Sequence, residues 1–116
     1  KITSANHLEL VSFLKEKEIS INGEEMVRRT RVELDANYGQ EDAEWLLEHQ
    51  NEIPAEFQRY YLVFTGTIWQ FAGGRRIVPS LSWHGECWCL YFFWLGRGWR
   101  SRDRLVRPRK SLHSPL

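Results

Sequence analysis

The basic residues near the C-terminus carry the strongest chemical signal in this sequence. Six arginines and Lys110 fall between positions 97 and 110, interleaved with tryptophan. Guanidinium groups bind phosphates and carboxylates in a planar, bidentate geometry, and tryptophan rings stack on bases or pack against other proteins. The segment therefore predicts a binding surface. Its candidate residues are Arg97, Trp99, Arg100, Arg102, Arg104, Arg107 and Arg109.

The spacing of three of these arginines indicates how they are presented. Arg100, Arg102 and Arg104 occupy alternate positions, so an extended strand would place their side chains on one face. Such a face suits a protein partner or self-association, because Arg and Trp are enriched at protein interfaces. The alternative is sequence-tolerant nucleic-acid binding by the same face. A third interpretation is internal, with the arginines stacked on Tyr91 and Phe93 and paired with glutamates of the N-terminal half.

A second cluster of reactive residue types lies at His84, Glu86, Cys87 and Cys89. A His-x-Glu step is half of the zinc deaminase signature, but the Pro-Cys-x-x-Cys half is missing from the chain. A catalytic thiol needs a low pKa, and an apolar segment such as this one raises the pKa of a thiol. We therefore expect no metal, no cofactor and no enzymatic activity, and the alternative is an enzyme that uses His84, Glu86 or Cys87.

The two halves of the chain carry opposite charge. Residues 1–58 contain 6 Lys and Arg against 13 Asp and Glu, whereas residues 59–116 contain 10 against 2, although the whole chain has a net charge of only +1. Either the two halves pair with each other, or each presents a differently charged surface to a partner.

Length and cysteine content limit the class of protein. A chain of 116 residues fits one domain with a single core. Two cysteines at positions i and i+2 do not make a disulfide framework, which indicates free thiols and a cytoplasmic protein. The N-terminus shows no signal peptide, and the longest apolar run, nine residues from Cys87 to Leu95, is too short for a membrane-spanning helix.

The acidic half has helical periodicity. Asn6 and Glu9 have the spacing of a capping box, which predicts a helix over residues 7–17. The stretch 19–21 is either a short strand or a loop, and Asn22-Gly23 favours a tight turn. Two further helices are expected at about 24–38 and 41–51, and a short helical turn at 55–59 follows Pro54.

The basic half reads as strands with period two. The predicted strands are 60–71, 77–83, 87–95 and 99–106, with turns at Gly73-Gly74, His84-Gly85 and Gly96–Gly98. The apolar run 87–95 is expected at the centre of the core, covered on both faces. Pro79 indicates that the strand 77–83 lies at an edge or contains a bulge.

These elements predict an α+β domain in which N-terminal helices (1–58) pack on a four-strand antiparallel meander (59–110), followed by a tail at 111–116. A small SH3-like barrel with helical decoration is the alternative. No motif identifies a family. The expected function is that of a non-enzymatic binding module, such as a small accessory or inhibitor protein, that acts by protein-protein contact through the Arg/Trp-rich surface.

Overall fold

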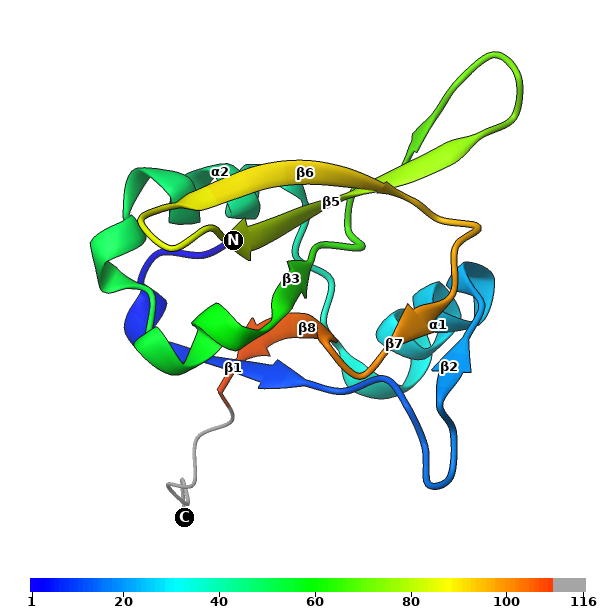
Figure 1. The fold of residues 1–116 in the computed structure, drawn as a ribbon, viewed down its shortest axis with the longest axis horizontal. Helices are drawn as coiled ribbons and strands as arrows, with labels where there is room; N and C mark the ends of the chain where they lie inside the picture. The colour runs from blue at the N-terminus through cyan, green and yellow to red at the C-terminus, as the bar shows by residue number, and fades with distance from the viewer. Residues whose placement is uncertain (110–116) are drawn as a thin grey trace.

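The computed structural model describes residues 1–109, and they form an α+β domain with two α-helices and a mixed β-sheet (Figure 1). The predicted fold class is confirmed at this level. The predicted tail at 111–116 lies outside the described residues. Within residues 1–109, no helix combines the length and the apolar character needed to cross a membrane.

Six strands form the main sheet. In space they follow the order β6-β5-β3-β8-β1, and β4 runs beside β5 beyond the end of β3. β3 and β8 are parallel, and every other pair is antiparallel. Two further strands, Ser20–Ile21 (β2) and Trp99–Arg100 (β7), form a separate antiparallel pair. The bounds of the six are Leu8–Val11 (β1), Tyr61–Val63 (β3), Trp69–Gln70 (β4), Arg76–Trp83 (β5), Trp88–Trp94 (β6) and Asp103–Pro108 (β8).

The predicted four-strand meander is wrong in its last step. The chain does form the successive hairpins β4-β5 and β5-β6, but β8 then pairs with β3 and β1 instead of returning beside β6. Among the described residues, β1 and β6 pair with one strand each and stay apart, so the sheet is open and does not close into an SH3-like barrel. The parallel pairing depends on contacts distant in sequence, which local patterns do not report.

The helices lie close to two of the three predicted positions. Gly23–Arg29 forms α1, which continues as a π-helical segment over Thr30–Leu34, and Gln40–Glu48 forms α2. Asn22 caps α1 by accepting a hydrogen bond from the Glu25 N–H at 2.9 Å, so Asn22-Gly23 begins a helix and does not form the predicted tight turn. Short 3₁₀ turns occupy Ala5–His7, Gln50–Glu52 and Ala55–Arg59, the last as predicted.

The predicted helix at residues 7–17 is wrong. Residues of β1 pair with β8 in the register Glu9↔Arg107 and Leu10↔Val106, and the Arg107 Nε donates to the Glu9 carboxylate at 2.7 Å. Asn6 does not cap a helix here; Ser4 instead caps the 3₁₀ turn Ala5–His7 that precedes β1. An apolar pattern this dense is compatible with either structure, and pairing with a distant strand decides between them.

The sheet is covered on both faces, so the prediction of a single core is also wrong. One apolar cluster lies between the sheet and α2, and the other lies between the sheet and α1. Gly23 at the start of α1 lies so close to the residue that follows β6 that an added Cβ would be 2.0 Å from the Leu95 carbonyl oxygen. The large buried side chains of the α1 cluster are Phe13, Met26, Leu105 and Trp99.

β6 is an edge strand, although its sequence predicts the centre of the core. β5 lies between β6 and β3 inside the sheet, and within the apolar run only Trp88 and Leu95 are buried. The β5-β6 turn spans four residues, so Trp83 pairs with Trp88 and the register differs by two residues from a two-residue turn.

Pro79 lies in the interior strand β5, which corrects the edge or bulge predicted for it. Its carbonyl oxygen accepts a hydrogen bond from the Phe64 N–H at 3.0 Å. Phe64 directly follows β3, at the point where the chain turns away from β5. Because the N and O atoms of one residue point to the same side of a strand, the missing N–H of Pro79 faces the break between β3 and β4. The predicted single strand 60–71 is divided at this break.

Candidate interaction surfaces

The predicted arginine face does not exist as one surface. Arg100 belongs to β7, Arg102 lies in a turn, and Arg104 belongs to β8. The turn is closed by the buried carboxylate of Asp103, whose Oδ2 accepts from the Arg100 N–H at 2.9 Å. The predicted strand 99–106 is therefore two strands, and the three side chains do not share a period of two.

Trp99 and Arg97 serve the fold. Trp99 is fully buried, with a relative exposure of 0%, and its Nε1 donates to the Leu95 carbonyl oxygen at 3.0 Å. The Arg97 guanidinium lies 4.0 Å from the centre of the Trp99 ring and 4.4 Å from that of Phe93. It also donates to both oxygens of Asp103, at 2.8 and 3.3 Å. These two predicted contact residues are internal supports of β7 and β8.

Only part of the basic charge is neutralised by the acidic half. Within residues 1–109, two ion pairs join the halves, Arg107 with Glu9 at 2.7 Å and Arg76 with Glu24. The guanidinium of Arg107 also donates to the Leu34 carbonyl oxygen, so this predicted site residue is internal as well. Arg109 is exposed, and its backbone N–H donates to the His7 carbonyl oxygen.

The acidic half neutralises itself around α1. The buried guanidinium of Arg29 donates to Glu18 at 2.6 Å and to Glu25 at 2.7 Å, and Arg28 donates to Glu25 and Glu33. These hydrogen bonds, from Arg29 to Glu18 and from Arg28 and Arg29 to Glu25, lower the pKa of both carboxyls from 4.5 to about 2. Three carboxylates of the acidic half, Glu18, Glu25 and Glu33, are thus engaged within that half and do not pair with the C-terminal arginines.

An exposed aromatic surface lies on the hairpin β4-β5, which projects from the body of the domain (Figure 1). Trp69 pairs with Ile77, and Ile77 pairs with Trp94, so these side chains share one face of the sheet. The Arg75 guanidinium lies 5.3 Å from the centre of the Trp94 ring. We call the exposed residues of this face the arm face: Trp69, Phe71, Arg75, Phe92 and Trp94.

The outer edge of β6 borders the arm face. The Leu95 N–H donates to the Arg76 carbonyl and the His84 N–H to the Cys87 carbonyl, so odd-numbered residues of this strand bond to β5 and even-numbered ones face outward. At one end the side chain of Gln50 closes the edge, because its amide accepts from the Trp88 N–H at 2.8 Å and donates to the Trp88 carbonyl at 3.3 Å.

Beyond Gln50 the edge is open. Within residues 1–109, β6 pairs with no strand except β5, which leaves the outward backbone groups of Leu90 and Phe92 without a strand partner. No residue from Trp88 to Trp94 is charged. Proteins usually block such edges with charge, proline or a covering element, because an open apolar edge pairs readily with another chain.

A second surface combines tyrosine with arginine. Two guanidinium groups lie over the ring of Tyr60, Arg104 at 4.4 Å and Arg59 at 5.9 Å, and Arg102 lies over Tyr61 at 5.0 Å. We call these five residues the Tyr-Arg cluster. Arg102 and Arg104 were predicted site residues, but their partners Tyr60 and Tyr61 were not. The signal for these partners is the pair of consecutive tyrosines between a helical turn and a strand.

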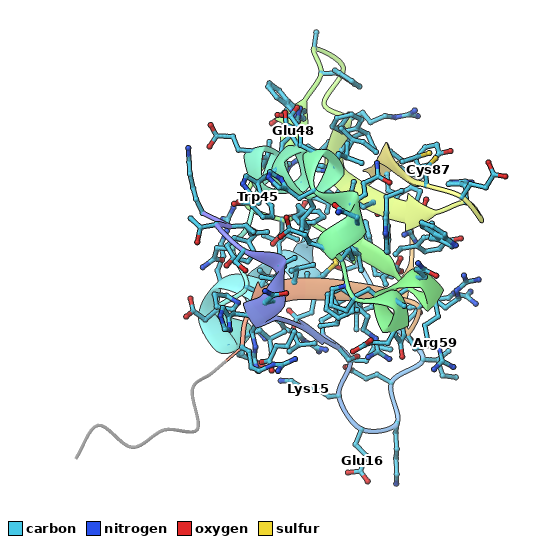
Figure 2. All side chains as sticks on the ribbon, turned by 90° about the vertical axis from the view of Figure 1, so that its left-hand side faces the viewer. Lys15, Glu16, Trp45, Glu48, Arg59 and Cys87 are labelled. Atoms are coloured by element: carbon cyan, nitrogen blue, oxygen red, sulfur yellow. The ribbon has the colours of Figure 1, made fainter. Side chains whose placement is uncertain are left out.

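A cavity of about 200 Å³ adjoins this cluster at Tyr61. In it the Ser82 hydroxyl and His84 Nε2 are 3.1 Å apart, and the His84 ring lies 5.3 Å from that of Tyr91. Figure 2 shows Arg59 and Cys87 on the side of the molecule away from Trp45 of α2. The lining residues are Tyr61, Ser82, His84, Tyr91 and Phe93.

The residues of the catalytic alternative lie at the β5-β6 turn. The Sγ atoms of Cys87 and Cys89 are 3.8 Å apart, and the hydrogen bond between them, with burial, raises the pKa of Cys89. A raised thiol pKa lowers the fraction of reactive thiolate. Within residues 1–109, no three His, Cys, Asp or Glu side chains are grouped so that they could hold a metal ion.

Comparisons of this chain with protein-family models, with curated proteins and with solved structures found no match. Its function is therefore inferred from its own surfaces. Three features stand out: the open edge of β6, the arm face beside that edge, and the Tyr-Arg cluster with its cavity.

Proposed function

We propose that this protein is a non-enzymatic binding module that contacts another protein chain along β6. The observation that carries the proposal is the open edge at Leu90 and Phe92, bordered by the aromatic arm face and, at Trp94, by a turn in which the Arg97 N–H donates to the Trp94 carbonyl oxygen. An incoming extended strand would complete the hydrogen-bond ladder, and its alternate side chains would pack against the aromatic rings. We therefore propose an Arg/Trp-bearing surface that includes Arg75 and Trp94, in place of the one that the sequence predicted around Trp99.

The exposed rings support a protein partner. Phe92 is 41% and Trp94 52% exposed, and Trp69 and Phe71 are about equally open. Contiguous apolar surface of this kind mostly marks an interaction site in a water-soluble domain, since each ring gains free energy when it leaves water. Large aromatic side chains are also the residues that dominate the energy of protein interfaces.

The partner that the strand fits best is a second copy of this chain. β6 is nearly symmetric about Phe92, with Tyr91 and Phe93 on either side and Leu90 and Trp94 beyond them. Two β6 strands can therefore pair antiparallel about a two-fold axis at Phe92, with each Leu90 opposite Trp94 of the other copy. Because the strand is uncharged, no like charges oppose each other across this axis.

The arm face extends such an interface. Phe92 and Trp94 belong both to the edge strand and to the arm face, so pairing at β6 brings the two arm faces together along one continuous sheet surface. Gln50 limits the contact at the other end, because it already occupies the backbone groups of Trp88. The segment that would pair therefore runs from residue 90 to residue 94.

Sedimentation equilibrium of the purified protein tests this proposal. We expect a reversible dimer over a concentration range that reaches about 1 mM, where even an association of about −4 kcal/mol is visible. The Phe92→Pro substitution removes an N–H that points away from β5, so the monomer should keep its fold. It should weaken dimerisation at least tenfold, because the central pair of intermolecular hydrogen bonds is lost.

Phe92→Ala is the matched control, because it removes the same ring and keeps the backbone N–H. We expect this variant to dimerise more tightly than Phe92→Pro. A wild-type protein that stays monomeric up to about 1 mM would contradict the proposal. Equal weakening by the two substitutions would do so as well, because the backbone edge would then have no part in the contact.

A further inference from the structure

The cavity meets the Tyr-Arg cluster at Tyr61 and Arg102, whereas Arg59 and Arg104 lie over Tyr60, which points to the other face of the sheet. Arg102 lies over one face of the Tyr61 ring, and Tyr61 also lines the cavity, where its ring meets that of Phe93 edge to face at 5.7 Å. We infer that this cavity, with Arg102 beside it, binds an unpaired nucleotide of single-stranded nucleic acid, with the base in the cavity and an adjacent phosphate on Arg102.

The charge of the site favours an anion. Arg59, Arg102 and Arg104 form no ion pair within residues 1–109, although Arg104 donates through Nε to the Ser101 carbonyl oxygen. Asp103, which is adjacent to Arg102 and Arg104 in the sequence, pairs with Arg97. Glu56 lines the neighbouring cavity with Arg59 and Arg104 but is not within ion-pair distance of either. Guanidinium groups held over tyrosine rings keep their outer N–H donors free, and phosphate oxygens match that fork of donors.

The cavity favours a flat ring. Its lining is aromatic except for Ser82 and His84, which form a hydrogen-bonding pair within it. At about 200 Å³ it is smaller than the roughly 300–1,000 Å³ of pockets for drug-sized ligands, so it suits a single ring system. A base in this position can stack on Tyr91 and exchange hydrogen bonds with Ser82 or His84.

The combination selects a single strand over a duplex. A base enters a concave aromatic pocket only when it has left its own stack, which is already the case in a single strand and costs a few kcal/mol in a duplex. The site is also separate from the edge of β6. Tyr91 and Phe93 bond to β5 through their backbones and point to the face opposite the arm face, so the nucleotide would lie on the other face of the sheet from the arm face.

Fluorescence anisotropy with a labelled oligothymidine of about 15 nucleotides tests the inference. We expect binding that weakens steeply between about 50 and 200 mM salt and a lower affinity for a duplex of equal length. Tyr91→Ala should weaken binding about tenfold by removing the stacking surface. Arg102→Gln should weaken it and reduce the salt slope by about one.

Two matched controls separate this site from other surfaces. Arg31→Gln removes an exposed arginine of the acidic half, and Trp69→Ala removes an exposed ring of the arm face; both should leave oligonucleotide binding within about twofold of the wild type. Absence of binding at about 50 mM salt would overturn the inference. So would binding that Tyr91→Ala and Arg102→Gln weaken no more than the two controls, or equal affinity for the duplex.

Discussion

The side chain of Gln50 forms two hydrogen bonds with the backbone of Trp88, accepting from its N–H at 2.8 Å and donating to its carbonyl oxygen at 3.3 Å. The amide thereby takes the place that a neighbouring strand would occupy. It closes the edge of β6 at its first residue, whereas the outward backbone groups of Leu90 and Phe92 have no strand partner within residues 1–109. This contrast defines the segment that we propose as the interface.

We expect Gln50→Ala to destabilise the domain by about 1–3 kcal/mol, because it leaves the backbone groups of the buried residue Trp88 without partners. Urea denaturation followed by circular dichroism measures the change. The adjacent and exposed Asn51→Ala is the control and should change the free energy of unfolding by less than about 0.5 kcal/mol. Dimerisation should persist in both variants, and equal stability of the two would contradict a role for Gln50 at the edge.

Trp99 and Trp94 should respond oppositely to substitution. Trp99→Ala should cost about 3–5 kcal/mol of stability, since the ring is fully buried and donates to the Leu95 carbonyl oxygen. Trp94→Ala should cost less than about 1 kcal/mol, since the ring is 52% exposed. The same denaturation measurement compares them, and similar losses from the two substitutions would show that Trp94 is not a surface residue.

The two tryptophans show what the sequence can and cannot predict. The α+β class and the places of α1 and α2 follow from local periodicity and turn residues, and the structure agrees with them. Burial of Trp99 and exposure of Trp94 depend on which strand lies at the edge of the sheet. That order depends on the distant pairing of β3 with β8, which no local pattern encodes.

Acid should destabilise the domain through Glu18 and Glu25. Their pKa is lowered to about 2 in the folded protein from an ordinary 4.5, so the stabilisation is fully present above about 4.5 and is lost as the pH falls toward 2. We expect the Tm to drop across this window. Arg29→Met should lower the Tm at neutral pH and flatten the drop, because both carboxyls lose a hydrogen-bonding partner.

The exposed Arg31→Met is the control for this acid titration and should keep the full drop in Tm. An unchanged acid dependence in Arg29→Met would mean that the two carboxyls are not the groups that titrate. Glu33, whose pKa is also lowered by hydrogen bonds from Arg28 and Lys15, should contribute to the acid dependence of all three proteins.

The candidate sites were only partly predictable for a similar reason. Basic residues are conspicuous in a sequence, so Arg102 and Arg104 were identified, but their aromatic partners Tyr60 and Tyr61 lie more than 40 positions away. An apolar run such as that of β6 reads the same whether it is buried or forms an open edge. The absence of charged residues in β6, together with the position of β6 at the edge of the sheet, is the basis for the interface that we propose.

Amide hydrogen exchange, resolved by residue with NMR, tests the proposed β6 interface most directly. The Phe92 N–H faces outward and should exchange rapidly in dilute protein, then become protected as the concentration rises to about 1 mM. The Phe93 N–H faces β5 and should be protected at every concentration. Protection of Phe92 that does not change with concentration, whether low or high throughout, would contradict pairing of two chains along β6.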